Sequence, residues 1–345
     1  MQFSISFPPL IDRSSSQPYR QTIELAQAAE RAGFDCITLG QHHFMEGVTS
    51  DPFGVLIALA AHTNRIRLGT CIYLLPLHHP LHVAEQLATL DEISGGRAAL
   101  GVGVGWSPHE YSAYGASTTE RGARMDEALS VLQKVLTEVD VAHEGRFWSF
   151  PALTLYPRPI QQPRPPLWVA GVAAKAVERA ARLGDSWLCD PVQTRPEVER
   201  LHKIYSDACT TLGKKPAWIL RRYVRLGLRR EIEEKWLPGF VERNLAYWRH
   251  STEGPNERRL FDRLDRGEKL SASDIARERF MWGSPEDIIS EMNTYMHLAP
   301  TDFGVSFSGG MTTNRWEHAT SDDFSDHLRS IEAFGREIIP EFRDR

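Results

Sequence analysis

The sequence predicts an α/β protein of the (β/α)8 TIM barrel type, with insertions. The chain has 345 residues, of which 41% are hydrophobic, so it can form a large packed core. Short apolar runs typical of buried strands occur eight times, and most are followed by a segment of helical period. This alternation indicates a parallel sheet covered by helices. The eight runs are FSISF, FDCITLG, IRLGTCIYL, RAALGVGVG, LWVAG, DSWLCD, ILRRYVRLGL and DFGVSFS.

The helical segments carry their own start and stop signals. YRQTIELAQAAERAG, after the first run, places apolar side chains on one face and ends at Gly33, a residue suited to a helix end. Pro52 and Pro80 suit the first positions of the next two helices. ERGARMDEALSVLQKVLTEV, after the fourth run, is amphipathic. Eight such units take about 250 residues, which leaves roughly 95 for insertions.

Two segments can hold this excess. Residues 140–166 read as a short hairpin followed by a proline-rich connector, and residues 229–279 read as a charged helical excursion. The second segment suits a lid or a subunit contact, although a charge run more often forms a solvated helix face. No solenoid repeat and no dividing linker is visible, so we expect one domain over residues 1–345.

Composition excludes several classes of function. The formal net charge of -5 provides no global basic field for nucleic acid or anionic lipid. We find neither a signal peptide nor an apolar stretch of the roughly 20 residues that span a bilayer, so a cytoplasmic protein is expected. The four cysteines stand singly, which favours buried reduced thiols.

Candidate catalytic residues follow the second predicted strand in TLGQHHFMEG. The chemistry of such barrels sits on loops at the carboxyl ends of the strands. His42 and His43 fall at that rim, where an imidazole can transfer protons near neutral pH. The alternatives are a metal site and an ordinary polar loop. His78, His79 and His82 lie nearby and include an H-x2-H spacing, but His82 falls inside a predicted helix, so we expect no metal site.

The next strands offer candidate contacts to a flat ligand. Thr70, Cys71 and Ile72 lie where the third strand would have to bend, unless they are regular core residues. Gly103 and Gly105 share one side of the fourth strand with Gly101, and glycines there usually mark close approach by another backbone or a ligand. Space for a planar ring, with Trp106 as a possible wall, fits better than a dinucleotide fingerprint, because no helix follows at once.

The fifth predicted strand passes into its helix through Ala170, Gly171 and Val172. Free N–H groups at the start of a helix bind anions, and Lys175 in the first turn adds positive charge. A tight turn that required a small residue explains the same pattern equally well.

Several blocks in order resemble the bacterial luciferase-like, flavin-dependent monooxygenases. They are ERAGFDCITLGQHHF, the long block from IRLGTCIYLL to HEYSAYG, PRPIQQPRPPLWVAGVAAKAVERAARLGDSW and WGSPEDIISEMNTYM. The resemblance covers nearly the whole chain and weakens in residues 215–275. It implies the same barrel, with a flavin at the carboxyl-terminal mouth.

The resemblance also implies roles for single residues. His42 matches the first histidine of the family's E-H-H motif, which supports flavin oxygen chemistry, whereas Gln41 stands where that motif has glutamate. His43 would support the loop or the flavin pocket. A non-prolyl cis peptide behind the flavin ring would correspond to Cys71–Ile72.

The phosphate contacts of the family are matched less completely. Val104 replaces one arginine, and Arg121 or Arg124 corresponds to a second. Gly171 and Val172 stand where luciferase has acidic and hydroxyl residues, which leaves backbone amides and Lys175.

The reaction implied is oxidation of a small, hydrophobic organic substrate by dioxygen and reduced FMN, with His42 as the acid–base group. Phe44, Tyr73 and Trp106 would suit such a substrate, although ordinary aromatic packing explains them nearly as well. A separate flavin reductase would supply the FMN, and the family suggests a homodimer. Two alternatives stay open. One is a deazaflavin-dependent oxidoreductase that transfers hydride, and the other is a catalytically silent flavin-binding protein.

Overall fold

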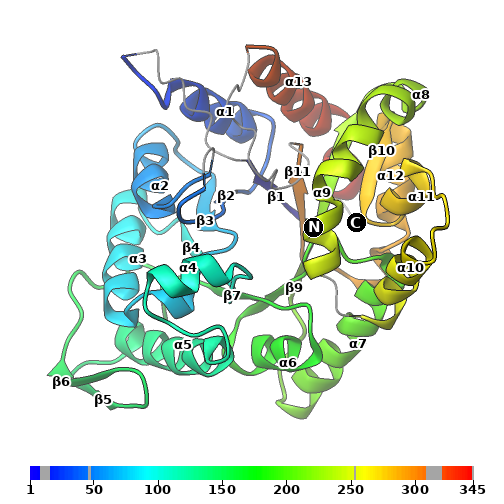
Figure 1. Ribbon diagram of the computed structural model, residues 1–345. Helices are drawn as coiled ribbons and strands as arrows, with labels where there is room; N and C mark the ends of the chain where they lie inside the picture. The colour runs from blue at the N-terminus through cyan, green and yellow to red at the C-terminus, as the bar shows by residue number, and fades with distance from the viewer. Residues whose placement is uncertain (8–15, 46–47, 252–253, 308–320, 344–345) are drawn as a thin grey trace.

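Eight parallel strands close into a barrel in the computed structural model, which describes residues 1–7, 16–45, 48–251, 254–307 and 321–343 (Figure 1). Neighbours around the barrel are β1, β2, β3, β4, β7, β8, β9 and β11, and pairing of β11 with β1 completes the ring. The predicted fold class is therefore confirmed, and each of the eight apolar runs contains one barrel strand. The strands are β1 Gln2–Ser6, β2 Cys36–Leu39, β3 Arg67–Thr70, β4 Ala98–Val102, β7 Leu167–Ala170, β8 Ser186–Leu188, β9 Trp218–Leu226 and β11 Asp302–Ser306.

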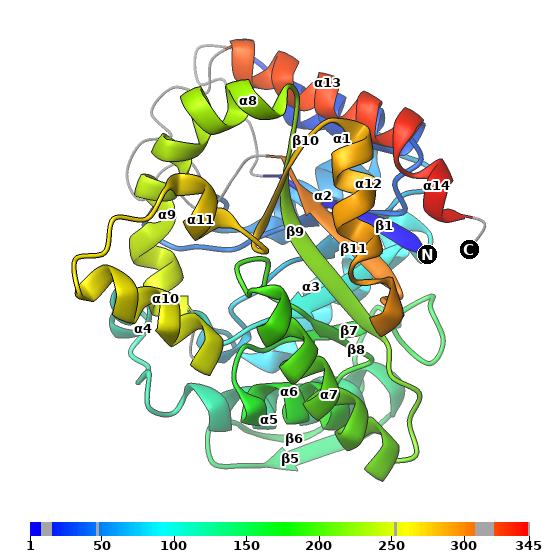
Figure 2. The ribbon, with the colours of Figure 1, turned by 90° about the vertical axis from the view of Figure 1, so that its right-hand side faces the viewer.

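Helices between the strands cover the outside of the barrel (Figures 1 and 2). Their ends follow the sequence signals: Asp51 caps α2 by accepting from the Gly54 N–H, and Gly95 ends α3 in the left-handed conformation, with φ of 68°. The covering helices are α1 Arg20–Arg31, α2 Pro52–Ala60, α3 Pro80–Ser94, α5 Arg121–Thr137, α6 Ala174–Leu183, α7 Arg195–Thr211, α12 Pro285–Asn293 and α13 Ser321–Glu337.

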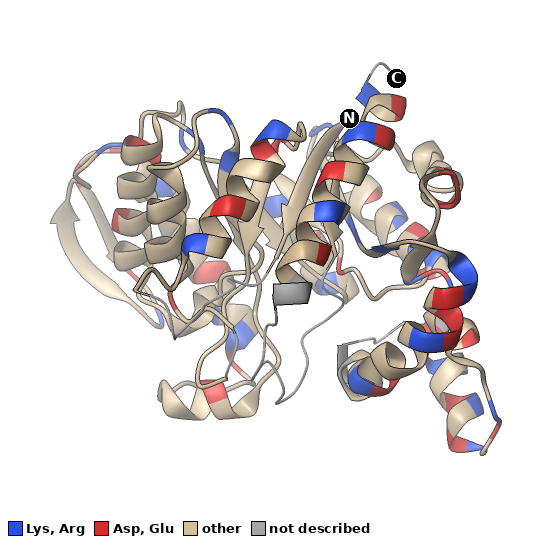
Figure 3. Ribbon diagram, turned by 90° about the horizontal axis from the view of Figure 1, so that it is seen from above, with Lys and Arg blue, Asp and Glu red and all other residues tan. Residues whose placement is uncertain are grey.

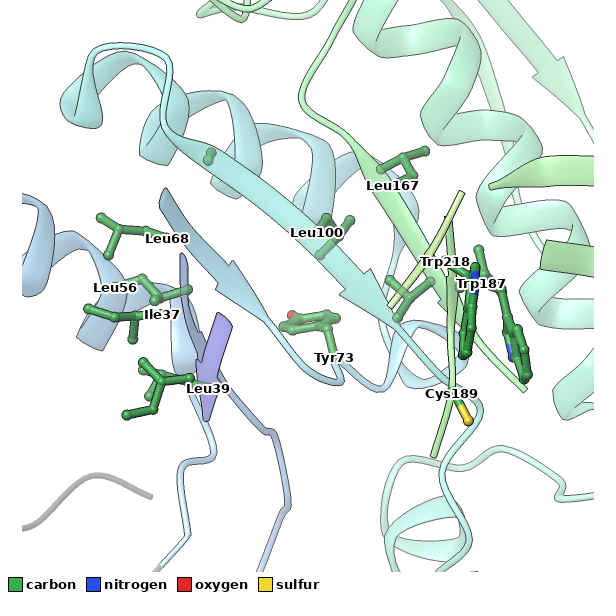
Figure 4. Packing of buried hydrophobic residues seen from close by; sticks show 14 of the residues in the cluster. Ile37, Leu39, Leu56, Leu68, Tyr73, Leu100, Leu167, Trp187, Cys189 and Trp218 are labelled. Atoms are coloured by element: carbon green, nitrogen blue, oxygen red, sulfur yellow. The ribbon is translucent and has the colours of Figure 1, made fainter. Parts of the chain in front are cut away.

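Buried aliphatic and aromatic side chains fill the space between strands and helices. β2 and β4 are buried along their whole length, as expected of strands covered on both faces. Trp187 and Trp218 stack with their ring centroids 5.5 Å apart (Figure 4). This core holds the strand ends in fixed positions, and the loops at those ends inherit that rigidity.

A hairpin follows α5, within the segment expected to contain one. Its strands are β5 Val141–Glu144 and β6 Ser149–Leu153. The Glu127 carboxylate of α5 fixes the turn, because it accepts from the N–H groups of Phe147 and Trp148 and contacts His143 Nε2 at 3.2 Å.

The charged excursion between β9 and β10 is helical and has its own aromatic core. Trp236 stacks on Phe240 and Phe280 with centroid distances of 4.6 and 5.2 Å. Its outer surface carries both signs of charge (Figure 3). Residues 252 and 253 of the predicted insertion lie outside the described residues. The elements here are α8 Arg229–Glu231, a π-helical turn Ile232–Trp236, α9 Leu237–Ser251, α10 Pro255–Asp265 and α11 Ala272–Ala276.

One strand was not predicted. β10, Phe280–Gly283, pairs with the end of β9 outside the barrel ring. The remaining short elements are α4 Pro108–Ala113, α14 Pro340–Arg343 and the 3-10 turns Leu75–Leu77 and Met296–Leu298. None of the helices in the described ranges combines the length and the apolar composition needed to cross a bilayer.

A buried carboxyl group at the start of β11 makes the stability of the fold depend on pH. Asp302 is 4% exposed and accepts a hydrogen bond of 2.7 Å from the Ser4 hydroxyl. Burial raises the pKa of Asp302 to about 6. The folded state therefore favours the protonated form, and its stability falls as the pH rises from about 4 to about 6.

We predict that Asp302→Asn removes this loss, because the amide oxygen can still accept from Ser4 but carries no charge. The variant should gain on the order of 3 kcal/mol relative to the parent protein between pH 4 and pH 7. Urea unfolding at both pH values measures the difference. An equal difference at the two pH values would contradict the role given to Asp302.

Candidate active site

The two histidines after β2 lie at the carboxyl end of the barrel, and a carboxylate from another loop holds them. Glu110 lies in α4, after β4, and is 1% exposed. Its Oε1 atom is 3.2 Å from His42 Nδ1 and accepts a 2.7 Å hydrogen bond from the His43 N–H. One oxygen therefore fixes both the His42 ring and the backbone of the loop.

The surroundings of Glu110 keep it ionised. Burial alone would raise its pKa, but hydrogen bonds from the His42 ring and the His43 N–H hold the pKa of Glu110 below its usual value. A carboxylate accepts hydrogen bonds and does not donate them, so His42 donates through Nδ1. His42 Nε2 is then the ring atom available to a reacting group.

Gln41 does not face this pair. Its side-chain oxygen accepts from the Leu74 N–H at 2.9 Å and lies 3.2 Å from His78 Nε2, while its amide nitrogen donates to the Ser50 carbonyl at 2.9 Å. Burial lowers the pKa of His78 to about 4, so this ring is neutral near pH 7. Gln41 thus joins the loops after β2 and β3, and both the oxygen and the nitrogen of its amide make contacts there.

His43 has one occupied ring nitrogen and one unoccupied one. Its Nδ1 atom is 3.0 Å from the Tyr114 hydroxyl, whereas its buried Nε2 finds no hydrogen-bond partner among the described residues. Burial lowers the pKa of His43, although the Glu110 carboxylate opposes this shift. A buried polar atom without a partner is costly, so this atom is suited to contact a bound ligand.

The predicted bend after β3 is present. The Cys71–Ile72 peptide bond is cis, as the family resemblance implied. The Thr70 hydroxyl donates to the Gly101 carbonyl at 2.8 Å, and the chain pairs with β4 again at Tyr73. Tyr73 is 3% exposed and packs on Phe53 and His78, so it belongs to the core and not to the rim.

The glycines of the fourth strand lie against the segment after β3. A Cβ atom on Gly101 would lie 2.2 Å from the Thr70 carbonyl oxygen, and one on Gly103 would lie 2.1 Å from the Ile72 side chain. Gly105 has φ of 71°, and its Cβ would meet Leu74 at 2.8 Å. These glycines therefore make room for the bend after β3, and that space is not open to a ring. Trp106 lies at the rim, with its ring centroid 6.4 Å from that of His42.

The structure distinguishes the two arginines considered for phosphate binding. Arg124 donates to the Pro76 carbonyl at 2.8 Å and lies 5.0 Å from the rings of both Phe147 and Trp148. Arg121 begins α5 and has no hydrogen-bond or ion-pair partner in the described part of the chain, so its guanidinium is available to an anion.

Helix α6 packs beside α5, and the backbone N–H groups at its start are further candidate donors to an anion. No side chain caps this helix, because its N-cap is Ala173, and Lys175 is exposed in its first turn. A Cβ atom on Gly171 would lie 2.8 Å from the Ala176 backbone, so the turn also needs its glycine. Ala170 and Val172, on either side of Gly171, are half-buried.

The other histidines of this region do not gather around a metal. His82 pairs with Glu85 at 3.8 Å on the exposed face of α3, and the His79 ring accepts from the Leu81 N–H. Within the residues that the structure describes, no group of three or more His, Cys, Asp or Glu side chains is placed to hold a metal ion.

Glu110 and Tyr114 were missed by the sequence analysis. From the sequence alone, SPHEYSAY is expected to be an intervening segment, but it contains the short helix α4, and Ser107 accepts a hydrogen bond from the Glu110 N–H. Only the fold shows that the Glu110 side chain turns to His42, 68 residues away in sequence. The available signal was the position of a glutamate on a short helix directly after a barrel strand.

These features define a (β/α)8 barrel with a histidine–carboxylate pair at its carboxyl-terminal mouth. The family model for luciferase-like monooxygenases matches residues 1–302, and the chain belongs to that family. It is 28% identical over 348 residues to the oxygenase component of a flavin-dependent trigonelline monooxygenase from Acinetobacter baylyi, covering 96% of this chain and 92% of the relative.

Solved structures show the same fold. The monooxygenase RslO1 from Streptomyces bottropensis has a TM-score of 0.79 and 27% identity, covering 99% of this chain and all of that one. A coenzyme F420 dependent tetrahydromethanopterin reductase from Methanopyrus kandleri has a TM-score of 0.75 and 18% identity, covering 99% of each chain. The second likeness shows the fold alone. The chain is thus an enzyme of the luciferase-like monooxygenase family.

We predict that Arg121→Ala weakens the binding of FMN by about 10-fold or more, the scale of a lost charge-assisted hydrogen bond. Riboflavin, which has no phosphate, should bind the parent and the variant equally. Fluorescence titration measures both affinities. Arg124→Ala is the matched control, because it should lower the melting temperature without a phosphate-specific effect. Equal losses for FMN and riboflavin in Arg121→Ala would remove Arg121 from the phosphate site.

Proposed function

We propose that the protein is an FMN-dependent monooxygenase that oxidises a small organic substrate with dioxygen. The observation that carries the proposal is the His42–Glu110 pair, which presents one imidazole nitrogen at the mouth of a barrel whose family uses flavin chemistry. Bound reduced FMN would supply the electrons that activate dioxygen. His42 would hold and move the proton.

Three groups fit the proposed cofactor. The unpartnered His43 Nε2 suits a polar edge of the flavin, the bend from Thr70 to Ile72 suits its ring, and Arg121 with the start of α6 suits its phosphate. Gly103 and Gly105 leave space for the side chains of Ile72 and Leu74, so their contribution to the cofactor site is indirect. Trp106 adds an aromatic wall next to His42.

The substrate is proposed to be small, with a planar apolar part. Phe44 is 65% exposed and has φ of 59°, a left-handed conformation that costs about 1 kcal/mol or more for a residue with a side chain. Its ring contacts those of His109 and Tyr114, with centroids 5.8 and 6.1 Å away. An exposed ring in an unfavourable conformation contributes little to folding, so it is suited to contact a substrate.

Partners and location are part of the same proposal. The Acinetobacter relative is called an oxygenase component, which supports a separate flavin reductase for this chain. The outward side of α2 carries Val55, Ile57 and Ala58, which are half-buried, and no charged side chain, so it suits a homodimer contact. We place the protein in the cytoplasm, as the sequence suggests.

The cofactor is tested by titration with FMN and with deazaflavin, followed by mixing of each reduced complex with dioxygen. We expect FMN to bind and its complex to consume oxygen, with consumption coupled to oxidation of a substrate. Trigonelline and other pyridine carboxylates are the first compounds to test, given the Acinetobacter relative. Binding of deazaflavin alone, with hydride transfer and no oxygen uptake, would identify a deazaflavin-dependent oxidoreductase instead.

We predict that His42→Ala lowers kcat for substrate oxidation by roughly 100-fold or more, the scale of a lost acid–base group. FMN affinity should change much less, because the loss concerns the reaction and not the binding. Steady-state oxygen uptake and flavin titration measure the two quantities. Unchanged turnover would exclude His42 from the mechanism, and a protein without turnover in any form would be a flavin-binding protein only.

A further inference from the structure

The family pattern expects a carboxylate beside the first histidine, and this chain has Gln41 there. Two side chains could replace that carboxylate: the amide of Gln41 itself, or a carboxylate from elsewhere in the fold. Gln41 is excluded by its contacts, because its oxygen and nitrogen are bound to Leu74, His78 and Ser50. Glu110 reaches the His42 ring from α4, on a different loop.

We infer that Glu110 is the positioning residue of His42. Its carboxylate holds the neutral ring in the tautomer with hydrogen on Nδ1, so that Nε2 is the atom that accepts a proton during the reaction. The reaction named in this inference rests on the proposed function, whereas the assignment of the His42 tautomer rests on the contact with Glu110 alone.

The geometry gives Glu110 little freedom. The side chain is almost fully buried, and the same oxygen that faces His42 Nδ1 accepts from the His43 N–H at 2.7 Å. Rotation of the carboxylate away from His42 would leave the buried His43 N–H without its acceptor, which is unfavourable. The loop backbone thus keeps the carboxylate aimed at the ring.

The charges around His42 also favour this role of Glu110. A proton that reaches Nε2 converts His42 into an imidazolium, and an adjacent carboxylate stabilises that cation. His43 also faces His42 and would oppose its protonation if charged, but burial keeps His43 in the neutral form near pH 7. Trp106, on the loop after β4, carries no charge. When the proton leaves Nε2, the Nδ1–H tautomer is restored and Glu110 remains ionised throughout.

Nitrogen NMR of histidine-labelled protein without cofactor tests the inference directly. The chain has 13 histidines, so the His42 signals are assigned by their absence in His42→Ala. We expect the Nδ1–H tautomer in the parent protein at high pH. In Glu110→Gln the preference for this tautomer should weaken, so that signals of the Nε2–H tautomer appear beside those of the Nδ1–H tautomer, because the carboxylate that accepts from Nδ1 has been removed.

The control is a second carboxylate–histidine pair in the same chain. Glu127 lies 3.2 Å from His143 Nε2 and accepts from backbone N–H groups, as Glu110 does, but it serves the β5–β6 hairpin. Glu127→Gln should change the tautomer signals of His143 and leave those of His42 unaltered. Glu110→Gln retains an oxygen that can accept from the His43 N–H, so the loop should keep its fold.

Kinetics provide the second measurement. Glu110→Gln should lower kcat by about 10- to 100-fold with little change in KM. Glu127→Gln should leave both constants unchanged.

Two results would overturn the inference while leaving the proposed function intact. One is an Nε2–H tautomer of His42 in the parent protein, which needs no variant to detect. The other is a Glu110→Gln variant with the parent's kcat and the parent's His42 tautomer. Failure of the proposed function has a different signature, because a parent protein that oxidises no substrate could still show the Nδ1–H tautomer.

Discussion

The buried carboxylate of Glu110 determines the conformation on which the rest of the site depends. It joins the loop after β2 to the loop after β4, across a barrel strand that separates them. The Gln41 side chain does the same between the loops after β2 and β3. Two side chains thus join the ends of three consecutive strands. They differ in hydrogen bonding, since the Glu110 carboxylate only accepts whereas the Gln41 amide both donates and accepts.

This division of roles explains why Gln41 and Glu110 are not interchangeable. A glutamate at position 41 would place a carboxylate against the Ser50 carbonyl, where the amide now donates a hydrogen bond. An amide at position 110 keeps an acceptor for the His43 N–H but lacks the charge that stabilises an imidazolium. The departure from the family pattern at position 41 therefore need not remove carboxylate chemistry from the site. It changes which loop supplies the carboxylate.

Much of the fold could be predicted from the sequence because its signals are local. Each barrel strand lies within a short apolar run, and Pro52, Pro80 and Gly33 mark helix ends through their own backbone preferences. β10 was missed because FMWG is short and pairs only with the end of β9. Residues in or next to the second to fourth strands, such as His42 and Trp106, are placed by the strands themselves. Glu110 and Tyr114 act across about 70 residues, so no local pattern reveals them.

The glycines of β4 show that one pattern fits two explanations. Their alternation indicates close approach, and the groups that approach are Thr70, Ile72 and Leu74 of the neighbouring segment. Contact of these glycines with the proposed flavin stays a prediction. The proposed acid–base pair comes from residues 42–110, whereas the charged excursion after β9 has a separate aromatic core around Phe240. Substitutions inside the excursion core can therefore alter the stability of the excursion without moving the His42–Glu110 pair.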